Sequence, residues 1–250
     1  MSEDFDMDKK ERYITDDLDD VETKELMDSL PNYFGGFGDI DRSAYLNWRF
    51  YPFQDLGSQF SQMAEAYFEV AILLIDECLK DNWSKKADIW IFPIMFNAIH
   101  GVETYLKAFN SLYRIHEELR NTGELQKSEI EDGHNIQQLC KNSISLLKKS
   151  NNNESNALIN EFKFVQKFIE ILYQNTNDMT FTRYPTKNKK QNHQNHFYIG
   201  SSKNVVISLD VFRQWVLRVF RILENLTGHI EYQVDTLKDM RSEYLSNIDY

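Results

Sequence analysis

The stretch that decides the fold is residues 87–119, ADIWIFPIMFNAIHGVETYLKAFNSLYRIHEEL. Its first half is apolar on almost every side, a pattern typical of a central, buried helix. Proline is tolerated in the first turn of a helix, where its missing N–H has no helical partner to lose. We therefore expect the regular helix to begin near Phe92, one residue before Pro93, and the other elements to pack around it.

A row of polar side chains interrupts this apolar helix. His100, Glu103, Thr104 and Lys107 are spaced by three, four and seven residues, which places them on one helical face. Ion pairing among His100, Glu103, Lys107 and a neighbouring histidine would satisfy a buried row of this kind, so we expect a structural role. His134 is expected to cap or pack at the start of the next predicted helix, and we assign it to the same structural group.

Apolar residues recur at intervals of three and four in four further stretches, and each predicts an amphipathic helix. These stretches are residues 58–79, 134–149, 158–173 and 211–237. The first should lie antiparallel to the central helix, because the connection between them is short. Polar loops are expected at residues 121–133 and 151–156, Ser208 or Asp210 can cap the last helix, and Gly228 can bend or divide it. The predicted fold class is mainly α, an up-and-down helical bundle.

Residues 181–207 differ in character from the helical stretches. The segment FTRYP at residues 181–185 is expected to be extended, because of its proline and aromatic residues. Short β-branched or aromatic runs at residues 197–199 and 205–207 flank a turn of Gly, Ser and Asn, which predicts a small β-hairpin insertion. The predicted organisation is an acidic arm at 1–30, an aromatic lead-in segment at 31–57, and a helical domain at 58–250 with the basic insertion at 181–207.

Charge is unevenly distributed along the chain. The net charge is −11, and residues 1–28 alone carry −8. Residues 181–221 carry +7, with Asp210 as the one acidic residue. An acidic arm is most simply a solubilising tail, and a second hypothesis is that it lies over the basic patch and screens it until a polyanion competes.

The cysteines and the apolar runs bear on location. Cys78 and Cys140 fall on apolar positions of predicted helices and form neither a disulfide framework nor a metal-type pair, which favours a reducing, cytoplasmic location. The longest apolar run, residues 89–99, is too short to span a bilayer, and the N-terminus has no signal-peptide pattern, so we expect no membrane association. His193 and His196 lack a nearby acidic ligand, so we predict no metal site and no cofactor.

Three local patterns follow one another in a particular order. They are NAIHGVETYLK at residues 97–107 in the buried helix, GHNIQQL at 133–139 opening the next helix, and FTRYP at 181–185 before the final long helix. Together they resemble HEPN-type helical domains over roughly residues 58–240. The resemblance implies an α-helical bundle, often dimeric, of the kind found in bacterial toxin–antitoxin, phage-defence and RNA-cleaving systems.

Catalytic members of that family carry an arginine followed after four to six residues by a histidine, and two copies form a metal-independent ribonuclease at a dimer interface. This chain departs from that spacing, because Arg221 precedes His229 by seven intervening residues and Arg183 precedes His193 by nine. A folded-back loop could still bring Arg183 to His193 and His196, and these three are our candidate catalytic residues. The alternatives are a solvated basic loop for that cluster and a surface arginine with a helix-terminal histidine for the other pair.

The basic segment, residues 181–221, also suits binding of single-stranded RNA or tRNA, where cations contact phosphates and aromatic rings stack on bases. The candidate RNA-binding residues are Lys187, Lys189, Lys190, Lys203, Tyr184, Tyr198 and Arg213. The first hypothesis is a HEPN-like protein of an RNA-targeting defence or toxin–antitoxin system that binds RNA and cleaves it as a homodimer. The alternative is a non-catalytic HEPN-like interaction or regulatory module for a partner enzyme from the same operon.

Overall fold

The computed structural model describes residues 43–44, 55–123, 130–150, 153–176, 179–183 and 205–248. The chain divides into two units, residues 1–45 and 46–250, and every described helix belongs to the second. The predicted acidic arm and most of the aromatic lead-in segment lie outside the described residues.

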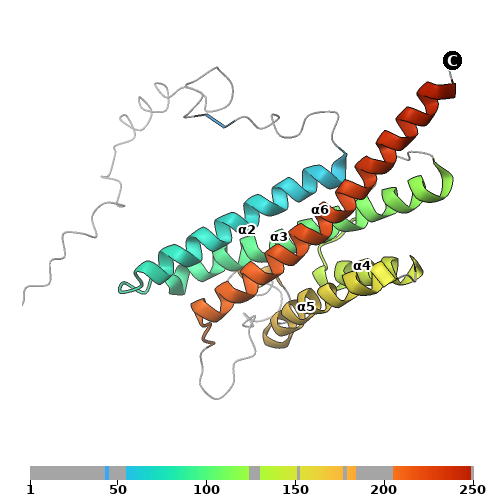
Figure 1. The fold of residues 1–250 in the computed structure, drawn as a ribbon. Coiled ribbons are helices and arrows are strands. Elements are labelled where there is room, and N and C mark those ends of the chain that lie inside the picture. The colour runs from blue at the N-terminus through green and yellow to red at the C-terminus, as the bar shows by residue number, and fades with distance from the viewer. Residues whose placement is uncertain are drawn as a thin grey trace, which may run out of the picture. The chain divides into compact units, whose positions relative to one another are not determined.

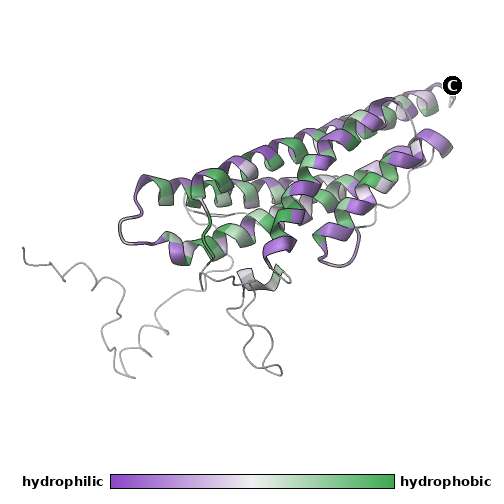
Figure 2. Cartoon of the chain, turned by 90° about the horizontal axis from the view of Figure 1, so that it is seen from below, coloured by the Kyte–Doolittle hydropathy of each residue, from purple (hydrophilic) through white to green (hydrophobic). Residues whose placement is uncertain are grey.

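The second unit is a helical bundle, as the periodicity predicted (Figure 1). Within the described residues its elements are α2 (Leu56–Lys80), α3 (Ala87–Thr122), α4 (Ile136–Ser150), α5 (Asn153–Asn175), the short 3-10 helix η4 (Met179–Thr182) and α6 (Leu209–Ile248). Each of the five long stretches predicted to be helical is helical. Figure 2 shows the expected amphipathic pattern, with hydrophobic faces turned inward and hydrophilic faces outward.

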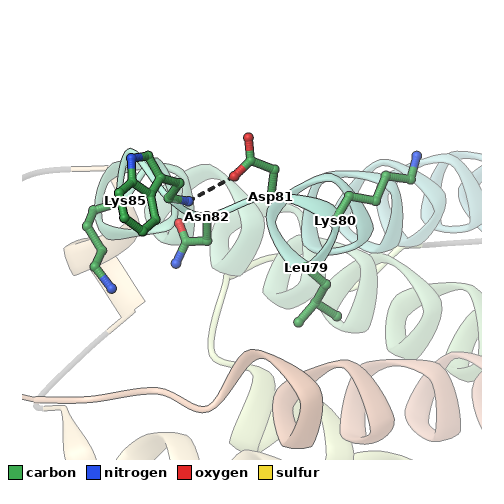
Figure 3. Close-up of a pocket in the computed structure, with 6 residues that line it drawn as sticks. Leu79, Lys80, Asp81, Asn82 and Lys85 are labelled. Carbon is green, nitrogen blue, oxygen red and sulfur yellow. Dashed lines mark hydrogen bonds between the residues drawn. The ribbon is translucent and has the colours of Figure 1, made fainter. Parts of the chain in front are cut away.

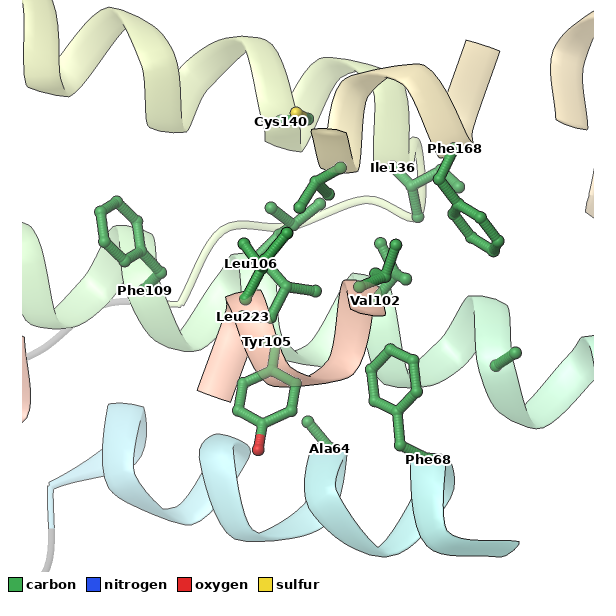
Figure 4. Close-up of a cluster of buried hydrophobic side chains, with 14 of the residues drawn as sticks. Ala64, Phe68, Val102, Tyr105, Leu106, Phe109, Ile136, Cys140, Phe168 and Leu223 are labelled. Carbon is green, nitrogen blue, oxygen red and sulfur yellow. The ribbon is translucent and has the colours of Figure 1, made fainter. Parts of the chain in front are cut away.

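Helix α3 lies at the centre of the hydrophobic core, which confirms the sequence prediction. It packs against α2 and α6 and also against α4, while α5 packs on α4 and α6. In Figure 4 the Tyr105 side chain points from α3 toward Ala64 and Phe68 of α2. Cys140 of α4 lies on the opposite side of α3. Both sides of the helix are therefore covered by other elements.

The two cysteines are buried free thiols in α2 and α4, in keeping with their apolar sequence positions. Burial raises the pKa of the Cys140 thiol to about 12. The thiol is therefore neutral at physiological pH and behaves as a small apolar side chain.

The relative directions of the helices follow from contacts between them. A Cβ on Gly57 would meet Leu112, and one on Gly101 would meet Phe68, so α2 and α3 are antiparallel as predicted. Ion pairs join Asp76 to Arg213 near one end of α2 and Asp55 to Lys238 at its other end, so α6 runs antiparallel to α2.

Helix α4 runs in the same direction as α3, so the predicted up-and-down arrangement is wrong for these two helices. Glu103 bonds to His134 just before α4, and Tyr113 of α3 bonds to Ser150 at the end of α4. The end of α3 at Thr122 and the start of α4, which lies beside Glu103, are therefore about 28 Å apart along α3, at 1.5 Å per helical residue.

Local capping residues set several helix ends. The Asp55 carboxylate accepts a hydrogen bond from the Ser58 N–H at 2.9 Å and caps α2. Gly123 ends α3 in the left-handed region, with φ of 68°, and its N–H donates to the Leu119 carbonyl. Ser208 accepts the first hydrogen bonds of α6, as predicted, and α6 continues through Gly228 without a break.

The predicted start of the central helix near Phe92 is wrong. Helix α3 begins at Ala87, and Pro93 lies inside it. A proline in a helix removes the hydrogen bond to the carbonyl four residues earlier, here that of Ile89. Ile89 and Pro93 are both exposed, so water can satisfy that carbonyl and the helix tolerates the ring.

Two other boundaries also differ from prediction. The loop expected at residues 151–156 is shorter, because α5 begins at Asn153. The polar composition that suggested a loop also suits a first helical turn, where Glu154 favours the positive end of the helix dipole. The segment expected to be extended, residues 181–185, instead begins within η4, in which the Thr182 hydroxyl donates to the Met179 carbonyl at 2.9 Å.

The predicted β-hairpin is described only in part. Val205, Val206 and Ile207 have no strand conformation, and the rest of the hairpin, including residues 197–199, lies outside the described residues. Val206 is largely exposed, whereas Ile207 packs against the hydrophobic core. Residues 205–207 therefore lead directly into α6.

Two glycine substitutions test the packing of α2 on α3. A Cβ at Gly101 would lie 2.7 Å from the Phe68 ring, whereas a Cβ at Gly228 would meet nothing within 4 Å. We expect Gly101→Ala to lower the free energy of unfolding by about 1–3 kcal/mol through overpacking. The matched variant Gly228→Ala should raise it by about 0.5–1 kcal/mol, because alanine favours the helix. Urea unfolding measures the free energy of unfolding of both variants, and an equal change in the two would contradict the described packing.

Candidate functional site

The polar row predicted on the central helix forms a partly buried cluster around Glu103, which we call the Glu103 cluster. Its members are His100, Glu103 and Lys107 of α3, and His134 just before α4. Lys107 donates to the Glu103 carboxylate at 3.0 Å, and His134 Nδ1 lies 2.8 Å from the same oxygen. His100 Nδ1 lies 3.7 Å from the other oxygen. The predicted ion pairing with a neighbouring histidine is confirmed, and His134 is that histidine.

The cluster keeps a buried carboxylate ionised. Glu103 and Lys107 are only 7% and 8% exposed. Burial opposes ionisation of the Glu103 carboxyl, but contacts with His100, Lys107 and His134 outweigh it and lower its pKa from 4.5 to about 2. A group with this pKa is a permanent anion at physiological pH and is unsuited to act as a general acid or base.

His134 is the most exposed member of the cluster, with 80% of its side chain accessible to solvent. Because the Glu103 carboxylate carries no proton, the hydrogen of this contact must lie on His134 Nδ1. In the neutral ring, Nε2 then carries the lone pair. A carboxylate that fixes the tautomer of an exposed imidazole is an arrangement capable of accepting and returning a proton.

His100 is held differently, between aromatic rings. Its ring makes an edge contact with Tyr67 of α2 at 4.5 Å and stacks on Phe96 at 5.5 Å, measured between ring centroids. Thr104, the fourth polar residue of the row, donates to the His100 carbonyl at 2.7 Å within its own helix. These contacts give both residues structural roles.

Sequence analysis missed a second polar cluster that continues the first. The Glu131 carboxylate accepts hydrogen bonds from Arg114, from Asn142 at 3.0 Å and from Asn110 at 3.4 Å. Asn110 also bonds to Ser143 of α4 at 2.7 Å. A signal was present, because Asn110 and Arg114 continue the spacing of three and four residues along the face that carries Glu103 and Lys107.

The described part of the basic segment is engaged with the bundle. Arg213, a candidate RNA-binding residue, donates to both carboxylate oxygens of Asp76, one of them at 3.0 Å, and so joins α6 to α2. Trp215 stacks on Phe164 at 4.6 Å and Phe220 on Phe68 at 5.1 Å. Both rings pack against the hydrophobic core and are only partly exposed.

The candidate catalytic residues are described only in part. Arg183 is exposed directly after η4, while His193 and His196 lie outside the described residues. The same holds for the candidate RNA-binding residues Tyr184, Lys187, Lys189, Lys190, Tyr198 and Lys203. His229 does not pair with Arg221, because its Nε2 lies 2.7 Å from Glu154 of α5. This bond lowers the pKa of the Glu154 carboxyl.

Comparison of the chain with protein-family models, with curated proteins and with solved structures finds no match. Among the described side chains, no group of three or more His, Cys, Asp or Glu is arranged to hold a metal ion. None of the described helices carries an apolar stretch long enough to cross a membrane. The function must therefore be argued from the chain's own residues.

The Glu103 carboxylate should make stability depend on pH. Its folded pKa is about 2 and its ordinary value is 4.5, so the stabilisation is complete above about pH 4.5 and is lost as the pH falls toward 2. The loss should amount to about 3 kcal/mol. Urea unfolding at several pH values should show this loss for the native chain and not for Glu103→Gln, so that the two curves converge below pH 4.5.

The matched control is His134→Ala, which removes an exposed partner and leaves the buried pair of Glu103 and Lys107 intact. We expect His134→Ala to lower the free energy of unfolding at pH 7 by under about 1 kcal/mol. Glu103→Gln should lower it by about 3–5 kcal/mol, because Lys107 is left buried without its anion. Similar costs for the two variants would show that the buried pair is not the stabilising contact.

Proposed function

We propose that this chain is a HEPN-like protein of an RNA-targeting defence or toxin–antitoxin system, acting in the cytoplasm as a homodimer, and that it binds RNA through residues 181–207. The observation that carries the proposal is the charge of this segment, which holds five cationic side chains and no acidic one. A run of this kind attracts phosphates and releases their counterions. Its tyrosines supply rings on which unpaired bases can stack.

The place where the segment joins the bundle supports this proposal. Residues 205–208 lead into α6, and Arg213 in the second turn of α6 is paired with Asp76 near the end of α2. The Asp76 carboxylate is thus already paired with a cation of α6. The positive charge of residues 181–207, which no acidic residue of that segment balances, would attract a polyanion.

The contact between two of the three sequence patterns supports the HEPN-like assignment. Glu103 belongs to the pattern at residues 97–107, and His134 belongs to the pattern at 133–139. The hydrogen bond between them makes one unit of two segments that are separated by a long connection. Two patterns that also contact each other support the resemblance more strongly than two patterns that match only in their order along the chain.

RNA binding can be tested with a charge variant. We expect the triple variant Lys187→Gln, Lys189→Gln and Lys190→Gln to bind single-stranded RNA more weakly, because three phosphate contacts are lost. The slope of log affinity against log salt should become shallower by about 2. Filter binding of a labelled oligouridylate at several salt concentrations measures both quantities.

The matched control removes three lysines from another surface, through Lys148→Gln, Lys149→Gln and Lys163→Gln, which are all exposed on α4 and α5. Its net charge equals that of the test variant, so a general charge effect would weaken both equally. Equal losses, or no salt-dependent binding by the native chain, would refute the proposed site.

The proposed reaction is metal-independent cleavage of RNA. It needs a base for the ribose 2′-hydroxyl, a proton donor for the leaving oxygen and a cation for the charge that develops on phosphorus. His193 and His196 would supply the first two groups and Arg183 the third. The alternative is a non-catalytic module for a partner enzyme, and it is supported by the departure of this chain from the spacing of four to six residues between arginine and histidine.

These alternatives are separated by an activity assay. If the chain is a ribonuclease, the purified protein should cleave tRNA or single-stranded RNA in the presence of EDTA, and Arg183→Ala or His193→Ala should slow cleavage at least a hundredfold. His134→Ala is a third variant for the cleavage assay, since the exposed ring of His134 is the other candidate base. Salt-dependent RNA binding without cleavage by the native chain would favour the non-catalytic module.

A further inference from the structure

Trp83 lies in the turn between α2 and α3 with 93% of its surface exposed. Tryptophan is rarely so exposed, because a large apolar side chain gains free energy when it is buried. The turn borders an open hollow of about 610 Å³ (Figure 3). The hollow is lined by Leu79, Lys80, Asp81, Asn82, Trp83 and Lys85. Most of these residues are polar or charged.

Hydrogen bonds fix the shape of this turn. The Asp81 carboxylate accepts from the Trp83 N–H at 2.9 Å, the contact drawn in Figure 3. The Asn82 side-chain oxygen accepts from the Ala87 N–H at 3.0 Å, and the Asn82 carbonyl accepts from the Lys85 N–H at 3.0 Å. The Trp83 ring is therefore presented from an ordered backbone.

Lys85 adds a second unfavourable feature to the same turn. The φ of Lys85 is 57°, which lies in the left-handed region. Among the described residues other than glycine, Lys85 alone has such a φ. This conformation strains a side chain that has a Cβ, and strained residues concentrate at functional sites. Glycine would relieve the strain but would remove the positive charge that lines the hollow.

We propose that this turn is a stacking subsite for one base of a single-stranded RNA. Trp83 would stack on the base, the Asn82 amide and the second oxygen of Asp81 would face the polar edge of the base, and the ammonium of Lys85 would contact a phosphate. The inference rests on the proposed RNA binding and extends it to a residue outside the basic segment.

The position of the turn makes it continuous with that segment. The turn follows Lys80 at the end of α2, and the pair of Asp76 and Arg213 places the start of α6 beside the same end. The basic segment enters α6 there, through residues 205–208. An RNA strand that contacts residues 205–208 would therefore lie at the same end of the bundle as Trp83. The polar lining of the hollow favours RNA over an apolar protein surface.

The test compares variants of the full chain in binding a labelled single-stranded RNA of twelve uridines. We expect Trp83→Ala to weaken binding about tenfold and Trp83→Phe to retain most of the affinity, since phenylalanine also stacks. The matched control is Tyr232→Ala, which removes a 72% exposed aromatic ring about 28 Å along α6 from Arg213 and should leave affinity unchanged. Circular dichroism confirms that each variant is folded.

Tryptophan fluorescence gives a direct measure of stacking. RNA should quench the tryptophan fluorescence of the native chain, and Trp83→Phe should abolish most of that quenching. If Trp83→Ala binds RNA like the native chain while the Lys187, Lys189 and Lys190 variant does not, this inference is overturned and the proposed function stands. Loss of self-association in Trp83→Ala, with unchanged RNA affinity, would overturn it in favour of a protein interface.

Discussion

Helix α3 is covered on several sides, and this constraint determines how the rest of the bundle is built. A polar group on a buried helix must find a partner inside the protein, because an unpaired buried charge is very costly. Glu103 meets this requirement with a lysine from its own helix and a histidine from outside it. The second partner has to be delivered by another part of the chain.

The connection between α3 and α4 delivers that partner. Because α4 runs parallel to α3, residues 130–135 pass along the polar face of α3 before α4 begins. Within these residues, Glu131 bonds to Arg114 and Asn110, and His134, three positions later, bonds to Glu103. A tight turn between antiparallel helices would have placed none of these groups there. The unexpected direction of α4 and the buried polar row are thus two aspects of one arrangement.

The sequence predicted the helices and the polar row because both depend on local spacing. Periodicity places Ala64, Val102 and Leu223 in the core whatever the order of the helices in space. The start of α3 could not be predicted, since tolerance of Pro93 depends on the exposure of Ile89 and its carbonyl. The partners of Arg213 and His229 lie 137 and 75 positions away along the chain, and no local pattern identifies them.

The pairing of α6 with α2 has a consequence for how the chain acquires its structure. Lys238 meets Asp55 across 183 positions, so the ribosome releases α2 and α3 long before their last partner exists. Until then the apolar surfaces of Phe68 and Tyr105, which Phe220 later covers, are open to solvent. Exposed surface of this kind promotes aggregation of a growing chain. Chaperones that shield nascent polypeptides should therefore matter most for this protein between the emergence of α3 and the docking of α6.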